Sequence, residues 1–117
     1  MSATTRHCFA LDLHDDADLI AEYERHHEAD NIWPEITASI RDAGIANLEI
    51  YRVGDRLLMI MDVTGDFDPA NKALADSQNP KVIAWEKLMW RFQKPLPFAK
   101  EDEKWLDMQR IFKLGET

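Results

Sequence analysis

Several residue types that often define a function are scarce in this sequence. Cys8 is the one cysteine, which excludes an intrachain disulfide and is the usage expected of a cytoplasmic protein. The four glycines are scattered, so there is no glycine-rich phosphate-binding loop and no nucleotide cofactor is expected. No basic run occurs and the net charge is −8, which argues against nucleic acid and anionic membranes as partners. The longest apolar run, residues 57–61, is far too short to cross a bilayer, and the polar first residues predict no signal peptide.

The composition is that of a globular protein. The chain has 117 residues, 45% hydrophobic and 31% charged, which predicts one α+β domain over residues 1–117. Apolar periodicity and turn residues predict strands at 6–13, 45–53 and 56–63, and helices at 17–27, 34–43, 69–75 and 80–92. Residues 105–114 are predicted to form a last strand or an arm. Cys8 lies in the first strand, where a core position is expected.

The order of these elements predicts a ferredoxin-like fold, an antiparallel sheet with helices on one face. Residues 57–61 read Leu-Leu-Met-Ile-Met and are apolar on both faces of their strand. An antiparallel strand with water on one side normally alternates between apolar and polar residues. We therefore expect a second apolar layer on the other face of the sheet, and the sheet of a partner subunit fits best. The prediction is a homodimer of the dimeric α/β-barrel type.

A tyrosine and a histidine stand four residues apart at the end of the first predicted helix. Tyr23 and His27 would share one helix face, just before a Trp33-Pro34 helix restart. A phenol has an ordinary pKa of about 10 and an imidazole of about 6.5, so the pair can exchange protons at neutral pH. The structural alternative is a histidine that only stabilises the helix end. The adjacent His26 is rotated by about 100° and is expected in solvent.

Other kinds of catalytic site find little support. No second histidine pair accompanies His27, and adding Asp30 gives two ligands where a catalytic zinc has three, so no metal is expected. There is no Gly-x-Ser-x-Gly motif, and Cys8 has no visible base. Proton transfer without a cofactor remains the simplest chemistry for the Tyr23–His27 pair.

Tryptophans are a second candidate for function. The four tryptophans are Trp33, Trp85, Trp90 and Trp105, and each alone is as well explained as a core residue. Sugars combine apolar C–H faces with hydroxyl groups, and an indole beside a carboxylate matches both. The Trp85-Glu86 dipeptide has this combination, although Glu86 can also be read as a solvated residue at the rim. Together with Tyr23 and His27, these two residues would form a pocket for a small polyol.

The motifs around these residues resemble those of a known family. They are Glu22-Tyr23 followed by His27, Ile32-Trp33-Pro34-Glu35, Glu49-Ile50-Tyr51, Leu58-Met59-Ile60-Met61, a helix at 82–89 containing Trp85, and Ile111-Phe112 in a terminal strand. Over nearly its whole length the chain resembles the L-rhamnose mutarotase family, and most closely its branch associated with L-fucose. The resemblance implies a cofactor-free homodimer of ferredoxin-like subunits that interconverts the α and β anomers of a 6-deoxy sugar.

The resemblance also implies roles for single residues. It makes His27 the proton donor, Tyr23 a substrate-binding residue and Trp85 the first of two tryptophans that hold the sugar. The rhamnose type commonly has a second tryptophan where this chain has Glu86, and a substrate-contacting tyrosine where it has Leu48. Two extra residues also lie between His27 and Trp33. Leu48 and Glu86 are therefore predicted pocket positions that favour L-fucose over L-rhamnose.

Anomers of a pyranose interconvert by ring opening, in which a base takes the anomeric hydroxyl proton while an acid protonates the ring oxygen. The resemblance implies that His27 is the acid, whereas Tyr23, Glu86 or a bound water is left open as the base. Two other functions fit the same fold, because fold alone does not fix function. One is a small cofactor-free monooxygenase that acts on a large aromatic substrate, and the other is a non-catalytic sugar-binding dimer.

Overall fold

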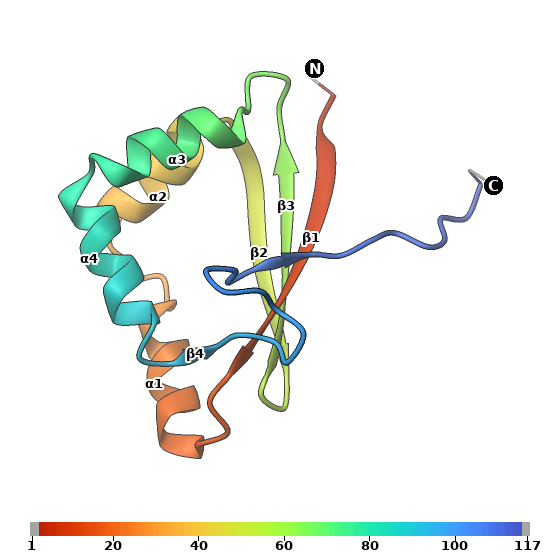
Figure 1. The fold of residues 1–117 in the computed structure, drawn as a ribbon. Coiled ribbons are helices and arrows are strands. Elements are labelled where there is room, and N and C mark those ends of the chain that lie inside the picture. Colours follow the sequence, from red (N-terminus) through yellow and green to blue (C-terminus); the bar gives the residue numbers. More distant parts are fainter. Residues whose placement is uncertain (1–2, 116–117) are drawn as a thin grey trace.

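The computed structural model describes residues 3–115 of the chain. The elements follow the order β1 (Thr5–Leu13), α1 (Ala17–His26), α2 (Pro34–Asp42), β2 (Ile45–Val53), β3 (Arg56–Val63), α3 (Pro69–Ser77), α4 (Pro80–Met89), β4 (Gln93–Lys94) and β5 (Leu106–Asp107). The sheet has the order β2-β3-β1-β4, all its pairs are antiparallel, and β5 pairs with β1. Figure 1 shows the helices together on one side of this sheet. The predicted ferredoxin-like α+β fold is confirmed.

Local sequence signals explain where most elements begin. The hairpin between β2 and β3 turns at Gly54, whose φ of 58° is a conformation that glycine adopts without strain. The side chain of Asp16 accepts hydrogen bonds from the first turn of α1, and Asp68 does the same for α3. Prolines occupy the first turns of α2, α3 and α4, where a missing N–H loses no helical hydrogen bond.

Helix α4 ends at Met89, three residues earlier than predicted. The amide N–H groups of Arg91 and Phe92 bond to carbonyls three residues back, which closes a tight turn. Gln93 and Lys94 then pair with Leu13 and Asp12 at the end of β1. Phe92 is still fully buried, so it extends the buried apolar face of α4 although it lies beyond the end of the helix.

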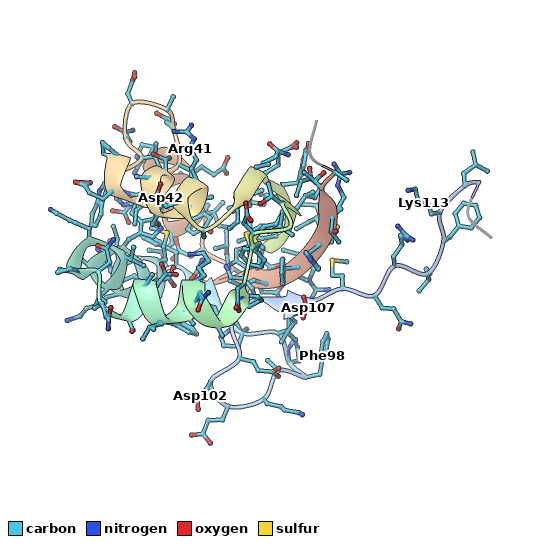
Figure 2. All side chains as sticks on the ribbon, turned by 90° about the horizontal axis from the view of Figure 1, so that it is seen from above. Arg41, Asp42, Phe98, Asp102, Asp107 and Lys113 are labelled. Carbon is cyan, nitrogen blue, oxygen red and sulfur yellow. The ribbon has the colours of Figure 1, made fainter. Side chains whose placement is uncertain are left out.

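The C-terminal segment contains both a short strand and an arm. The β5 strand covers only Leu106–Asp107, and its last backbone contact with β1 is the Met108 N–H to the Cys8 carbonyl, at 2.8 Å. Beyond it the chain leads away from the body, as Figure 1 shows, and Figure 2 places Lys113 far out on this arm. Ile111, Phe112 and Leu114 are 91%, 65% and 86% exposed. A strand over the whole of 105–114 is therefore not formed, since strand pairing among residues 3–115 covers only Leu106–Asp107 of that range.

The core lies between the helices and one face of the sheet. Its larger cluster contains Leu13, Tyr23, Ile36, Leu57, Val82, Trp85, Met89 and Phe92, and a smaller one contains Ile45, Met61 and Val63. On β3 the odd-numbered residues from Leu57 to Val63 point into these clusters, while Leu58 and Ile60 lie half-buried on the opposite face. Cys8 pairs in register with Ile60 and is half-buried on that face. The expected core position of Cys8 is thus wrong.

Candidate active site

The end of α1 brings Tyr23 and His27 together. They lie one helical turn apart, and their ring centroids are separated by 4.4 Å with a tilt of 41°. Tyr23 is 3% exposed and belongs to the larger core cluster, whereas His27 is half-buried and serves as the C-cap of the helix. The helix therefore stops one residue before the predicted end. The predicted convergence of the two side chains is found.

A hydrogen bond fixes which nitrogen of His27 carries the proton. The Nδ1 atom lies 2.8 Å from the backbone carbonyl oxygen of Tyr23. A carbonyl oxygen only accepts hydrogen bonds, so Nδ1 is the protonated nitrogen, and the neutral ring has its lone pair on Nε2. Burial lowers the pKa of His27 below its ordinary value, with His26 adding to this and the Tyr23 carbonyl opposing it. At neutral pH His27 is therefore a neutral base at Nε2.

Aromatic rings surround this pair. Trp85 from α4 is 6% exposed and presents its ring edgewise to His27, with centroids 5.5 Å apart. Trp33 stands against Trp85 at 5.2 Å, and Phe92 meets Tyr23 at 5.9 Å. Apolar walls of this kind strengthen any electrostatic interaction made inside them, because they exclude water.

His26 is not in solvent as predicted. Its ring is half-buried and lies 5.6 Å from Phe92 and 6.3 Å from Trp85, measured between centroids. The large indole of Trp85 lies across the end of α1 and reaches both adjacent histidines. Trp90, by contrast, is 44% exposed and has Lys104 Nζ 5.0 Å from its ring centroid, so it is neither a core residue nor part of this cluster.

Gln93 is a polar member of the cluster that the sequence did not reveal. Its Nε2 donates a hydrogen bond of 3.2 Å to Tyr23 Oη, across 70 residues of sequence. Burial raises the pKa of Tyr23 to about 12, the Gln93 hydrogen bond opposes that rise, and the charge of Glu86 adds to it. Within residues 3–115, Gln93 Oε1 is the one buried side-chain oxygen or nitrogen without a hydrogen-bond partner. Such an atom destabilises a folded protein by about 1–3 kcal/mol.

The other two predicted pocket residues lie at the edge of the cluster or outside it. Glu86 is exposed on α4, and its carboxylate accepts a hydrogen bond from Lys104 Nζ. Burial is the main cause of the raised pKa of Tyr23, and the charge of Glu86 makes a smaller contribution in the same direction. Leu48 is half-buried on β2 and packs against the smaller core cluster around Ile45 and Met61, away from Tyr23 and His27.

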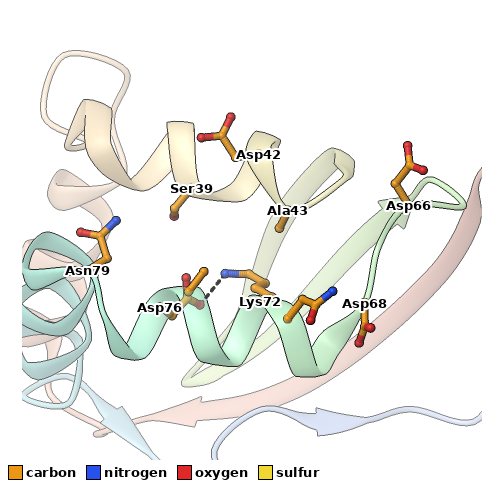
Figure 3. Close-up of a pocket in the computed structure, with 10 residues that line it drawn as sticks. Ser39, Asp42, Ala43, Asp66, Asp68, Lys72, Asp76 and Asn79 are labelled. Atoms are coloured by element: carbon orange, nitrogen blue, oxygen red, sulfur yellow. Dashed lines mark hydrogen bonds and ion pairs between the residues drawn. The ribbon is translucent and has the colours of Figure 1, made fainter.

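A cavity of about 350 Å³ lies elsewhere, between α2 and α3. Its lining carries four aspartates and Lys72, and Figure 3 shows Lys72 paired with Asp76 along α3, at 2.6 Å. Neither Tyr23 nor His27 lines it. In the part of the chain that the structure describes, no group of three or more His, Cys, Asp or Glu side chains is arranged to hold a metal ion. None of the helices within residues 3–115 reaches the length and hydrophobicity needed to cross a bilayer.

Known proteins resemble this chain in fold and in sequence. The structure superposes on an L-rhamnose mutarotase from Formosa agariphila with a TM-score of 0.66 and 19% identity, over 94% of this chain and 98% of the other. At that identity the likeness defines the fold class. In sequence the chain is 58% identical to an L-fucose mutarotase from Xanthomonas campestris pv. campestris, over 96% of this chain and 90% of the relative.

Residues 6–114 match the family model for L-rhamnose mutarotase. The chain belongs to the L-rhamnose mutarotase family, and the resemblance inferred from the sequence motifs is confirmed.

Proposed function

We propose that this protein is a sugar mutarotase, an isomerase of carbohydrate metabolism that interconverts the α and β anomers of L-fucose. The observation that carries the proposal is the pairing of buried Tyr23 with half-buried His27, whose Nδ1 is bonded to the Tyr23 carbonyl so that the lone pair of the neutral ring is on Nε2. The 58% identity with an L-fucose mutarotase supports L-fucose over other 6-deoxy sugars. A cytoplasmic location is proposed with it, on the basis of a single cysteine in a chain that acts on a small metabolite.

The reaction needs only proton transfer and rotation. A base removes the proton from the anomeric hydroxyl, the C1–O5 bond breaks as C1=O1 forms, and a proton is delivered to O5. Rotation about C1–C2 turns the other face of the aldehyde to O5, and the reverse steps close the ring. General acid–base assistance of this kind accelerates a reaction by about 10²–10⁴-fold. No cofactor takes part in these steps.

The pKa values narrow the choice of base. Tyr23, with a pKa of about 12, is a phenolate in only about one molecule in 10⁵ at pH 7. Glu86 is held by Lys104 at the surface. His27 Nε2 is therefore the base that opens the ring, and the imidazolium formed by this step is the acid that protonates O5. The family resemblance implies that His27 is a proton donor. That role is then the second of the two proton transfers, from the imidazolium to O5. Tyr23 holds the sugar with its hydroxyl, and Trp85 supports the apolar face.

The proposal is tested by measuring anomer exchange directly. Saturation-transfer NMR follows the exchange of the α and β H1 signals in L-fucose, L-rhamnose and D-galactose, with and without the protein. We expect acceleration with L-fucose, a smaller effect with L-rhamnose, and none with heat-denatured protein. Binding of L-fucose without faster exchange would mean a non-catalytic sugar-binding protein. Oxygen uptake with a quinol substrate would instead favour a monooxygenase.

We also propose that the protein is a homodimer joined through the uncovered face of its sheet. The helices lie on the other side of the sheet (Figure 1). Leu58 and Ile60 form the apolar centre of the uncovered face, and ion pairs flank them, Arg56–Asp12 at 2.7 Å and Arg6–Asp62 at 2.8 Å. An apolar centre with a polar rim is the usual anatomy of an interface. The exposed apolar arm at 108–115 offers further surface for a second copy.

A further inference from the structure

Gln93 has a position that packing alone does not explain. It lies in the two-residue strand β4, which pairs with the end of β1, and it is 3% exposed. Its amide donates to Tyr23 Oη, but its Oε1 atom is buried and has no partner among the described residues. A leucine or methionine would fill the same space without an unsatisfied oxygen. Buried polar groups without partners are rare in folded proteins and call for an explanation.

We propose that Gln93 is a substrate-binding and positioning residue, which orients the Tyr23 hydroxyl through its N–H and accepts a hydrogen bond from a sugar hydroxyl at Oε1. This inference rests on the proposed sugar mutarotase function and adds a residue to its site. The ligand class it defines is a vicinal diol, such as two neighbouring hydroxyl groups of a pyranose.

The first part of the proposed role, orienting the Tyr23 hydroxyl, follows because a phenol has only one proton to donate. Tyr23 Oη has one proton to donate, and its oxygen already accepts a hydrogen bond from Gln93 Nε2. The proton of the Tyr23 hydroxyl is therefore free to point toward a ligand. The ring is held on its other sides by Phe92 and by His27, so the hydroxyl is fixed in direction as well as in position.

The second half follows from the geometry of the amide. Oε1 and Nε2 are bonded to the same carbon, so Oε1 lies beside the point where Nε2 meets Tyr23 Oη. One sugar hydroxyl can accept from the Tyr23 hydroxyl while its neighbour donates to Gln93 Oε1. The unpartnered acceptor is thus satisfied when the sugar binds. A site with a buried polar atom of this kind rejects ligands that lack the matching hydroxyl.

The first test removes both functions of the amide. Gln93→Leu is compared with Gln78→Leu, which makes the same change at an exposed glutamine on the end of α3. We expect Gln93→Leu to lower kcat/KM for L-fucose by about 10- to 100-fold, with the larger share in KM, and Gln78→Leu to change it less than about twofold. Circular dichroism and a thermal melt establish that both variants are folded. A folded Gln93→Leu protein with wild-type kcat/KM overturns the proposal.

The second test separates a functional role from a structural one by conservative rescue. In Gln93→Glu the introduced carboxyl is buried, and burial raises its pKa. Its neutral form has the shape of the amide, with an O–H that donates to Tyr23 and a C=O that accepts from the sugar. The ratio of variant to wild-type kcat/KM should therefore rise as the pH falls from about 8 to about 5. A flat ratio would show that Gln93 only fills space.

A binding measurement gives a readout that does not depend on turnover. The side-chain amide signals of Gln93 are assigned in a proton–nitrogen correlation spectrum as those missing from Gln93→Leu. Addition of L-fucose should shift these signals, while those of Gln78 stay in place. If wild-type protein neither binds L-fucose nor accelerates its exchange, the proposed function itself fails. If wild-type protein does both and the Gln93 signals do not move, only the role of Gln93 fails.

Discussion

The Nδ1 atom of His27 lies 2.8 Å from the backbone carbonyl oxygen of Tyr23, one turn earlier in α1. This contact holds the imidazole at the end of the helix, and in it the Nδ1–H group donates a hydrogen bond to the backbone. Nε2 is therefore the nitrogen that stays unprotonated in the neutral ring, and it is the atom proposed to take the proton of the sugar. The contact also places the imidazole at the C-cap of α1, with its ring centroid 4.4 Å from that of Tyr23.

Replacing His27 should remove catalysis and leave the fold. His27→Gln keeps a polar side chain of similar length but has no basic nitrogen. We expect the rate of L-fucose anomer exchange to fall by about 10²-fold or more, since the acid–base contribution is lost. His14→Gln is the matched control, because His14 is exposed in the turn before α1. A folded His27→Gln protein that retains the wild-type rate in saturation-transfer NMR would falsify the assignment of His27.

The acid side of the pH profile should report the titration of His27. Burial lowers its pKa in the folded protein, so the neutral form persists below the ordinary value near 6.5. If the neutral form is the base, as proposed, kcat/KM should be constant around neutral pH and fall only once the pH drops through that lowered pKa. A proton donor that had to be charged at the start would give the opposite sign, with activity rising in acid. Proton NMR of the imidazole signals in the free protein gives the pKa for comparison.

Tyr23 and Tyr51 allow a matched comparison, because they are the two tyrosines of the chain. Tyr23→Phe removes the buried hydroxyl and leaves Gln93 Nε2 without its acceptor. We expect stability to fall by about 1–3 kcal/mol in urea unfolding, and kcat/KM for L-fucose to fall by about 10- to 100-fold. Tyr51→Phe removes an exposed hydroxyl that bonds Glu49, so stability should change little. Equal effects of the two substitutions on activity would exclude a substrate contact by Tyr23.

The features of this site that could be predicted from the sequence depend on residues close together in the chain. The features that could not be predicted depend on contacts between residues far apart in the chain. Tyr23 and His27 meet because residues four apart share a helix face, and the Gly54 turn sets the β2–β3 hairpin in the same local way. Gln93 reaches Tyr23 across 70 residues, so no spacing rule could join them. The predicted end of α4 is wrong for a related reason. Phe92 continues the apolar periodicity of the helix and so predicts a longer helix, whereas the pairing of Gln93 with Leu13 on a distant strand requires the helix to end earlier.

The contribution of Glu86 can be tested from both ends of its ion pair. Glu86→Gln and Lys104→Met each remove the charge of one partner, and the ion pair itself contributes only about 0–1 kcal/mol to stability because the Glu86 carboxylate is exposed. If the Glu86 carboxylate takes a sugar hydroxyl, Glu86→Gln raises KM for L-fucose by about tenfold while Lys104→Met leaves it within about twofold. Equal KM values in the two variants would make Glu86 a surface residue only.

The proposed dimer depends on the apolar centre of the uncovered sheet face. Ile60 lies at that centre, in register with Cys8 on β1 and Glu49 on β2. Ile60→Lys would place an ammonium group in the apolar centre of the interface, and the cost of removing it from water favours the monomer. Light scattering after size exclusion should give twice the chain mass of 13.6 kDa for the wild type and the single mass for the variant. Leu74→Lys, at an exposed position on α3, is the control and should leave the dimer intact. A wild-type protein with a mass of 13.6 kDa at every concentration tested would contradict the proposed homodimer.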